Sequence, residues 1–240
     1  MWLYDIIDRY NIYNRLNTTL KELSFIVIVD LHIHESSFSS DSLMTLEEIV
    51  ATAMSKGLDG ICITDHDSMG LKERAERYSR ETGFPIFVGV EYYSLWGDIT
   101  AWGINDFPKT RVSAQAFIDL VRSQGGFCVA CHPFRNNNRG LAEHLRDVRG
   151  LNGIEVLNGS TSLEANLQAL DYCQELKLAP IGASDAHWLS QVGKYATWLP
   201  EYVDNLDDFV RVLHTGGCRP VVSGPNGYQF ADHQDIAISA

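Results

Sequence analysis

The side chains that could do chemistry in this chain are mainly histidines and carboxylates, and their first group is Asp30-Leu31-His32-Ile33-His34. Successive side chains of an extended segment point to opposite sides, so this spacing places Asp30, His32 and His34 on one side. Two imidazoles in that arrangement can bind one metal ion, although a pair of structural histidines is the alternative. The motif therefore predicts a metal site that begins at His32 and His34.

Further residues of these types follow other short apolar runs. In chain order they are Asp65, His66 and Asp67, then Glu91, then His132 and Arg135, then Glu155 and Asn158, and finally Asp185 and His187. Any one of them could be a helix cap or a satisfied polar group in the core. A whole series of strand ends that carry metal-ligand residue types by accident is far less expected, so the series predicts one shared site.

The apolar runs alternate with helical patterns. The expected strands are residues 25–31, 58–64, 85–90, 127–131, 153–157, 179–183 and 219–222, and the expected helices are 45–56, 71–81, 113–123, 141–147, 163–176 and 206–214. A strand pair over 92–95 and 99–103 surrounds a turn at 96–98. Continuous apolar strands between helices indicate an α/β fold with a parallel sheet, and six or seven such units favour a closed barrel. The carboxyl ends of barrel strands meet on one face, where the polar residues would converge.

We expect one domain over residues 25–223. Residues 1–24 have apolar positions at helical spacing and predict an N-terminal helical extension that packs on the domain, with a dimer contact or a lid as the alternative. Residues 224–240 predict a loosely packed C-terminal tail. Residues 1–23 carry charges throughout, so they do not have the pattern of a signal peptide.

Composition limits the class of partner. The chain has 240 residues and a formal net charge of −12, which argues against long nucleic acid or a membrane surface as partners. The five cysteines show no disulfide framework, which indicates reduced thiols and a cytoplasmic protein. Cys128 and Cys131 form a CxxC inside an apolar run, where burial in a strand is favoured over a redox or zinc site. A Cys131 side chain near a metal ion stays open as an alternative.

The ligand types indicate the chemistry. Imidazole and carboxylate without thiolate favour Mn, Zn or Fe. Several such ions held close together suit the hydrolysis of phosphate esters, because they bind phosphate oxygens, lower the pKa of a bound water and stabilise the leaving oxygen. A metal-bridging hydroxide would be the nucleophile. Arg135 could clamp a phosphate, and a surface salt bridge is its alternative role.

These motifs name a family. The segments 30–34, 64–67, 89–91, 131–133 and 184–187 resemble, in order, the motifs of the polymerase and histidinol phosphatase (PHP) superfamily. The match runs over residues 29–197. Residues 155–159 and 192–194 are similar to the stand-alone PHP phosphoesterases that have an associated C-terminal segment.

The resemblance implies a PHP-type distorted (β/α)7 barrel with two or three divalent metal ions, usually Mn, Zn or Fe. By the family pattern, the first ion would be held by His32, His34, Glu91 and Asp185, the second by Glu91 and His132, and the third by Asp41, His66 and His187. Glu91, Asp185 and Arg135 would be the residues closest to catalysis.

One departure from the pattern concerns the second ion. The family usually has another histidine on the strand after the glutamate, but residues 96–103 contain none. Asp98 is the nearest substitute, and Thr100 is a weaker one. An oxygen ligand here would favour Mn or Mg over Zn.

The sequence therefore predicts a metal-dependent phosphatase or phosphodiesterase for a small phosphorylated substrate or a nucleotide. The acidic composition and the absence of a basic stripe favour small substrates over long nucleic acid. Two alternatives stay open. One is an exonuclease-type phosphodiesterase that acts on short oligonucleotides, and the other is a catalytically impaired PHP module that binds or regulates.

Overall fold

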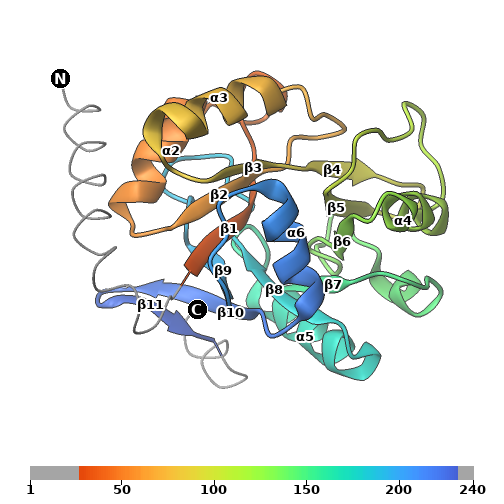
Figure 1. The fold of residues 1–240 in the computed structure, drawn as a ribbon. Helices are drawn as coiled ribbons and strands as arrows, with labels where there is room; N and C mark the ends of the chain where they lie inside the picture. Colours follow the sequence, from red (N-terminus) through yellow and green to blue (C-terminus); the bar gives the residue numbers. More distant parts are fainter. Residues whose placement is uncertain (1–26, 232–240) are drawn as a thin grey trace.

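A computed structural model describes residues 27–231 of the chain. Its strands are β1 (Val27–Ile33), β2 (Gly60–Ile63), β3 (Ile86–Val88), β4 (Val90–Tyr93), β5 (Asp98–Trp102), β6 (Phe127–Ala130), β7 (Gly153–Asn158), β8 (Ala179–Ala183), β9 (Tyr195–Leu199), β10 (Arg219–Gly224) and β11 (Gly227–Phe230). The helices are α2 (Leu46–Ser55), α3 (Lys72–Thr82), α4 (Ala114–Ser123), the 3₁₀ helix η2 (Ala142–Arg146), α5 (Leu163–Leu176) and α6 (Leu206–Thr215). Figure 1 shows their arrangement.

The strands pair into two sheets. One sheet has the order β11-β10-β9-β1-β2-β3 and the other has the order β4-β5-β6-β7-β8. The ladders β1–β2–β3 and β6–β7–β8 are parallel, as the alternating pattern predicted. The chain thus has a mixed α/β fold, but the hydrogen-bonded ladders do not close, so the expected (β/α)7 barrel is not confirmed.

Side chains and a glycine interrupt the ladder where the two sheets meet. The Thr197 hydroxyl donates to the Gly182 carbonyl at 2.8 Å and accepts from the Gly182 amide at 3.0 Å, so a side chain bridges β9 and β8. At the other junction Gly89 lies between β3 and β4, and a Cβ there would approach the Ala101 carbonyl oxygen to 2.4 Å. Isolated backbone bonds also join the sheets, from the His34 amide to the Ala186 carbonyl at 3.0 Å and from the Glu91 amide to the Asp65 carbonyl at 3.2 Å, without a continuous ladder.

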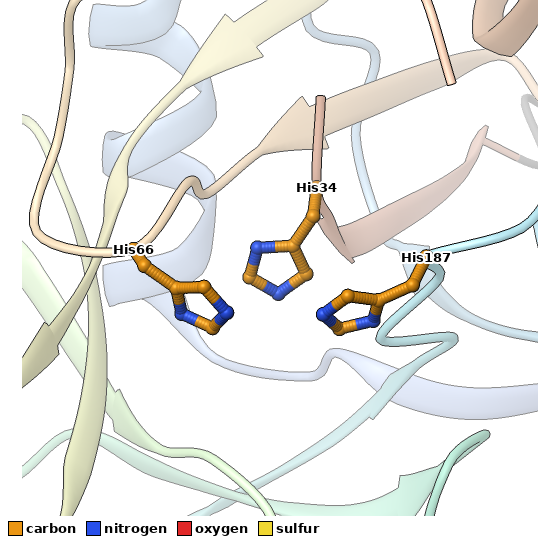
Figure 2. A group of neighbouring side chains, drawn as sticks. All are labelled: His34, His66 and His187. Carbon is orange, nitrogen blue, oxygen red and sulfur yellow. The ribbon is translucent and has the colours of Figure 1, made fainter. Parts of the chain in front are cut away.

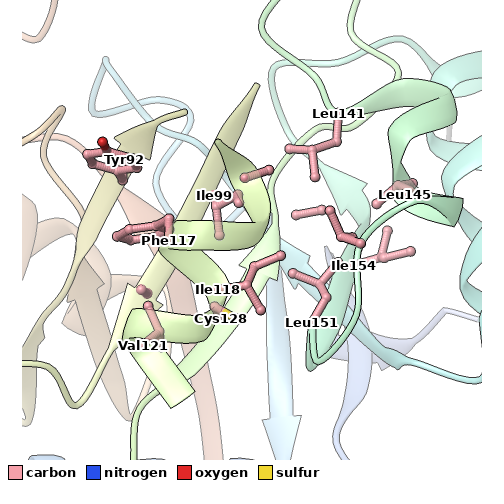
Figure 3. Close-up of a cluster of buried hydrophobic side chains, with 14 of the residues drawn as sticks. Tyr92, Ile99, Phe117, Ile118, Val121, Cys128, Leu141, Leu145, Leu151 and Ile154 are labelled. Carbon is pink, nitrogen blue, oxygen red and sulfur yellow. The ribbon is translucent and has the colours of Figure 1, made fainter. Parts of the chain in front are cut away.

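The helices cover the outer faces of the sheets and leave the strand ends free. The α2 and α3 helices lie along β2 and β3, and α4 and α5 lie along β6 and β7 (Figure 1). In the cluster of Figure 3, Phe117 and Ile118 of α4 pack with Ile99 and Cys128 of the second sheet. Because each helix buries an apolar stripe against its strands, the polar strand ends are the part left to form a site.

A third apolar cluster lies between the two sheets. Val29, Leu31 and Cys62 from the first sheet meet Val129 and Ile181 from the second. The α6 helix contributes the apolar residues Phe209, Val212 and Leu213 to this cluster. The interior is therefore filled with side chains, as in a barrel core, even though the ladder is open.

Most expected elements are present, with boundaries shifted by a few residues. The capping box at Thr45 opens α2 as predicted, and the hairpin at 96–98 joins β4 and β5 antiparallel. The sequence reading missed β9, which pairs antiparallel with β1 and β10. No helix among the described residues is long and apolar enough to cross a membrane.

Both expected extensions lie wholly or partly outside the described residues. The predicted helix over residues 1–24 lies outside them entirely. Of the predicted loose tail, residues 224–231 are described, and Gly227–Phe230 form β11 against β10. The ordered β-structure thus extends beyond the boundary that we placed at residue 223.

Candidate metal centre

The predicted ligands converge at one end of the two sheets. His32 lies on β1 and His34 directly follows it, while His66 follows β2 and Glu91 lies on β4. His132 follows β6, and Asp185 and His187 follow β8. Figure 2 shows the rings of His34, His66 and His187, which come from three separate chain segments and point toward one another. The structure therefore brings together residues that lie more than 150 positions apart in the sequence.

The local backbone is unusual at two of these ligands. His132 has a φ of 34° and Asp185 has a φ of 50°, both in the left-handed region that non-glycine residues rarely adopt. Such conformations persist where the surroundings require them, and they concentrate at functional sites. At Asp185 the turn follows β8 directly, so its carboxylate faces the histidines of β1.

The first ligand group surrounds His32 and His34. Their Nε2 atoms lie 3.0 Å apart, and both side chains are fully buried. Glu91 Oε2 lies 3.7 Å from the Nε2 of His32 and 3.5 Å from that of His34. Asp185 Oδ1 lies 3.6 Å and 3.3 Å from the same two atoms. Two imidazole nitrogens and two carboxylate oxygens thus face one point, as the ligands of one ion would.

The second group is formed by Glu91, Cys131 and His132. The Oε1 atom of Glu91 lies 2.8 Å from His132 Nε2 and 3.5 Å from Cys131 Sγ. All three side chains are buried. Glu91 therefore faces the first group with one oxygen and the second group with the other.

The third group is the most exposed. It contains His34, His66 and His187. The Asp41 Oδ2 atom lies 3.1 Å from His66 Nε2 and 3.3 Å from His187 Nε2, which brings Asp41 beside this group. The Asp41 side chain is 54% exposed, whereas Glu91 is 1% exposed. The centre therefore opens to solvent on the side of Asp41.

Burial and neighbouring charges together set the charge state of the cluster. Burial lowers the pKa of His34 to about 4, so its imidazole is neutral at pH 7. Burial alone would raise the pKa of Glu91 and Asp185, but the charge of His32 and the hydrogen bonds around them hold both pKa values well below the usual range. Burial alone would lower the pKa of His32 and His66, but the nearby carboxylates raise it, well above the usual range for His32 and to about 9 for His66. A bound cation would displace these protons, because neutral imidazoles and ionised carboxylates are the forms that coordinate metals.

Unsatisfied buried atoms test whether metal ions fit here. Glu91 Oε2, His66 Nδ1 and His132 Nδ1 are buried and lack a hydrogen-bond partner. Glu91 Oε2 and His66 Nδ1 lie 2.6 Å apart, but not in hydrogen-bond geometry. A buried carboxylate oxygen without a partner is costly, and a divalent cation would satisfy it. The donor set and the unpaired atoms fit the metal ions that the sequence predicted.

Arg135 lies at the edge of the centre. Its Nη2 atom bonds the Asp185 carboxylate and donates to Asn158 Oδ1 at 2.8 Å, while its Nε donates to Thr161 Oγ1 at 3.1 Å. The side chain is 20% exposed. Arg135 is therefore not a free surface residue, and its guanidinium is held beside a metal-ligand carboxylate.

Asp98 is not part of any of the three groups. Its two oxygens accept hydrogen bonds from Arg139 Nε at 2.6 Å and Arg139 Nη2 at 2.9 Å. The Nε2 atom of His132 lies 3.9 Å from Asp98 Oδ2. Burial raises the pKa of Asp98 to about 6, against the effect of its arginine partner. The structure thus places Asp98 in a buried ion pair beside the second group.

The sequence placed Glu155 and Asp30 near the ligands without giving either residue a specific role. Glu155 accepts from His32 Nδ1 at 2.8 Å with Oε1 and from the His132 amide at 3.0 Å with Oε2, so it orients two ligands. In the sequence, the sign of this orienting role is a single acidic residue, Glu155, within the otherwise apolar segment of β7. Asp30 points away from the cluster, and it accepts from the amides of Ser184 at 2.9 Å and Gly193 at 2.8 Å.

Fold and site define an α/β protein with a largely buried histidine–carboxylate cluster that could hold metal ions. The PHP domain family matches residues 30–127, and a PHP-associated family matches residues 164–218. The chain belongs to the PHP superfamily, as its motifs indicated.

Relatives and solved structures agree with this assignment. The uncharacterized protein MJ0417 of Methanocaldococcus jannaschii is 36% identical over 69% of this chain and 67% of its own length. A 5'-3' exoribonuclease of Haemophilus influenzae is 33% identical over 40% of this chain and 33% of its own length.

Among solved structures, a candidate metal-dependent phosphoesterase from Bifidobacterium adolescentis has a TM-score of 0.57 and 20% identity, over 78% of this chain and 96% of its own. The lesion-specific endonuclease PfuEndoQ from Pyrococcus furiosus has a TM-score of 0.62 and 15% identity, over 82% of this chain and 58% of its own. At these identities the likeness concerns the fold.

Proposed function

We propose that this protein is a metal-dependent phosphoesterase that hydrolyses a phosphomonoester or phosphodiester of a small molecule or nucleotide. The observation that carries the proposal is the sharing of ligands between the three groups. Glu91 belongs to the first and second groups, and His34 belongs to the first and third. Shared ligands hold ions close together, which is the arrangement suited to displacement at phosphorus.

The residues divide into metal ligands and a residue that would contact the substrate. His32, His34, Glu91 and Asp185 would hold the first ion, and His66, His187 and Asp41 would hold the ion nearest to solvent. Bound Mn, Zn or Fe ions would supply Lewis acidity and a nucleophilic water of lowered pKa. Arg135 would position the substrate, because its guanidinium can donate to a phosphate oxygen while Asp185, Asn158 and Thr161 fix its orientation.

A second candidate function is a phosphodiesterase that acts on short oligonucleotides. The observation that favours it is a pair of exposed aromatic side chains in the segments that carry the third group. Phe38, three residues before Asp41, is 42% exposed, and Trp188, next to His187, is 52% exposed. Aromatic rings at the mouth of a site can stack on nucleobases. The likeness to an exoribonuclease and to a DNA endonuclease supports this candidate and leaves the preference for small substrates a proposal.

Hydrolysis assays separate these candidates. The Mn²⁺-loaded protein is offered p-nitrophenyl phosphate, its bis-ester and a short single-stranded oligonucleotide. Phosphoesterase activity on the aryl esters supports the main proposal, and cleavage of the oligonucleotide alone supports the second. No turnover of any substrate would leave the regulatory binding module as the function.

A ligand variant tests the centre itself. His34→Ala is expected to lose metal and at least about a hundredfold in kcat/KM, because His34 contributes to two ligand groups. His144→Ala is the matched control, since His144 is exposed, pairs with Asp147 and stacks on Trp96. Metal content by elemental analysis and circular dichroism accompany the assay. A fully active His34→Ala protein would contradict the ligand assignment.

A further inference from the structure

The second metal group lacks the imidazole that β5 would normally supply, and Asp98 does not replace it. Both Asp98 oxygens accept charge-assisted hydrogen bonds from the forked Arg139 guanidinium. Asp98 also lies outside the compact ligand group of Glu91, Cys131 and His132, with its Oδ2 atom 3.9 Å from His132 Nε2. Another side chain must therefore complete the group if an ion binds there.

Cys131 is the side chain best placed to do so. It follows β6 directly and is fully buried. Its Sγ atom lies 3.5 Å from Glu91 Oε1, the oxygen that also contacts His132 Nε2 at 2.8 Å. The ligand atoms of Glu91, Cys131 and His132 all lie within 4.8 Å of one another.

These separations are close to those of a coordinated ion. In a tetrahedral zinc site with bonds of 2.0–2.3 Å, neighbouring ligand atoms lie about 3.3–3.8 Å apart. The sulfur–oxygen distance already falls in that range. The shorter imidazole–carboxylate contact would open by roughly half an ångström when an ion replaces the hydrogen bond. All three side chains of the group are buried, so an ion bound there would be enclosed by the protein.

We propose that Cys131 is a thiolate ligand of the second metal ion, together with Glu91 and His132. Binding converts the thiol to a thiolate, and the proton is released to the buffer. A sulfur ligand changes the metal preference of this site, since thiolate selects Zn, Co or Fe(II) over Mn and Mg. The inference deepens the proposed phosphoesterase function, on whose metal centre it rests.

Cys128 lies on β6, three residues before Cys131, and provides a matched control. It is also fully buried, and burial raises its pKa to about 12, but its Sγ atom faces Asn152 Oδ1 at 3.5 Å and packs in the apolar cluster of Figure 3. A serine at position 128 can keep a hydrogen bond to Asn152. Cys128→Ser therefore changes one buried thiol without touching the metal centre.

The test is a cobalt titration of the metal-free full-length chain, followed by absorption spectroscopy. Thiolate ligation gives a sulfur-to-cobalt charge-transfer band in the near ultraviolet. We expect this band in the unchanged protein and in Cys128→Ser, and not in Cys131→Ser. Zinc affinity at the weaker site should fall at least about tenfold in Cys131→Ser, because even partners that only orient ligands contribute that much.

Three results would overturn the inference: no such band in the unchanged protein, a band that survives in Cys131→Ser, or a band that is lost only in Cys128→Ser. If Cys131→Ser does not fold, the band in the unchanged protein and its retention in Cys128→Ser, Cys62→Ser, Cys173→Ser and Cys218→Ser decide the question. A band without phosphoesterase activity would refute the proposed function and keep the thiolate site. Phosphoesterase activity without a charge-transfer band would refute the thiolate site and keep the proposed function.

Discussion

Several side chains beside the metal centre hold ligands in place instead of facing an ion. Glu155 accepts hydrogen bonds from His32 Nδ1 and from the His132 amide, so it fixes a ring orientation and a backbone turn together. Ser39 lies 3.1 Å from His34 Nδ1 and donates to Asp65 Oδ1 at 2.8 Å. These partners leave the Nε2 atoms of His32 and His34 free to face the cation.

Arg135 is the residue whose role is most directly measurable. Arg135→Ala should reduce kcat/KM by about a hundredfold with the metal content retained, since preorganised donors to a developing charge contribute on that scale. Arg135→Lys should recover only part of the loss, because an ammonium cannot keep the forked contacts to Asp185 and Asn158. Steady-state kinetics and elemental analysis check this. Unchanged kinetics in Arg135→Ala would contradict a substrate-positioning role and show that Arg135 only forms a structural ion pair.

At the scale of the elements, short parallel units position the ligands, and their local signals agree with the fold. The α2 helix begins with a complete capping box, in which the Thr45 hydroxyl accepts from the Glu48 amide at 3.4 Å and Glu48 Oε2 accepts from the Thr45 amide at 3.0 Å. Ile49 and Val50 then bury its apolar face against β1 and β2. The helix therefore stabilises the strands that end in His34 and His66.

Loss of the helix cap should affect stability and not metal binding. Thr45→Ala should lower the free energy of unfolding by about 1 kcal/mol, which corresponds to about 2–4 °C in Tm for a chain of this length. Thr52→Ala in the same helix is the control, since Thr52 donates only to the Glu48 carbonyl and alanine favours a helix. Thermal unfolding by circular dichroism measures both, and an equal loss in the two variants would contradict a capping role.

The difference in unfolding free energy between Thr45→Ala and the unchanged protein should depend on pH. Hydrogen bonds from Thr45 lower the pKa of Glu48, so its stabilising contribution is present above the unfolded-state pKa and is lost as the pH falls through the lower folded-state pKa. The gap in stability between Thr45→Ala and the unchanged protein should therefore shrink in acid.

At the scale of the molecule, the metal centre concentrates negative charge in the interior. Glu91, Asp98, Glu155 and Asp185 are all buried within one region of a chain whose formal net charge is −12. Bound divalent ions would offset the repulsion between these carboxylates. The metal ions should therefore contribute to folding as well as to catalysis.

Metal removal should lower the thermal stability of the protein. At a metal concentration a hundred times the dissociation constant, binding stabilises the folded state by about 2.7 kcal/mol per site. For a chain of this length that corresponds to about 5–10 °C in Tm. Calorimetry before and after chelation, with Mn²⁺ or Zn²⁺ added back, measures the change. A Tm that is unaffected by chelation and restoration would contradict a structural contribution of the metals.

Much of the fold and the convergence of most candidate ligands could be predicted, because those signals are local. Apolar runs marked the parallel strands, and His and Asp residues directly after them marked where strand ends would meet. The role of Asp98 could not be predicted, because its partner Arg139 lies 41 residues further along the chain. The open ladder and β9 depend on contacts between distant segments, such as Thr197 with Gly182, which have no local pattern.

The position of β1 in the first sheet has a consequence for synthesis on the ribosome. All seven residues of β1 are buried, and the strand lies between β2 and β9, so one of its edges stays unpaired until residues 195–199 have emerged. An exposed apolar edge invites pairing with other chains, and a charge within the segment discourages it. Asp30 supplies that charge. Burial raises the pKa of Asp30 to about 6 in the folded protein. In the nascent chain, where this burial is absent, the Asp30 side chain is ionised at neutral pH while the edge of the strand is exposed to other chains.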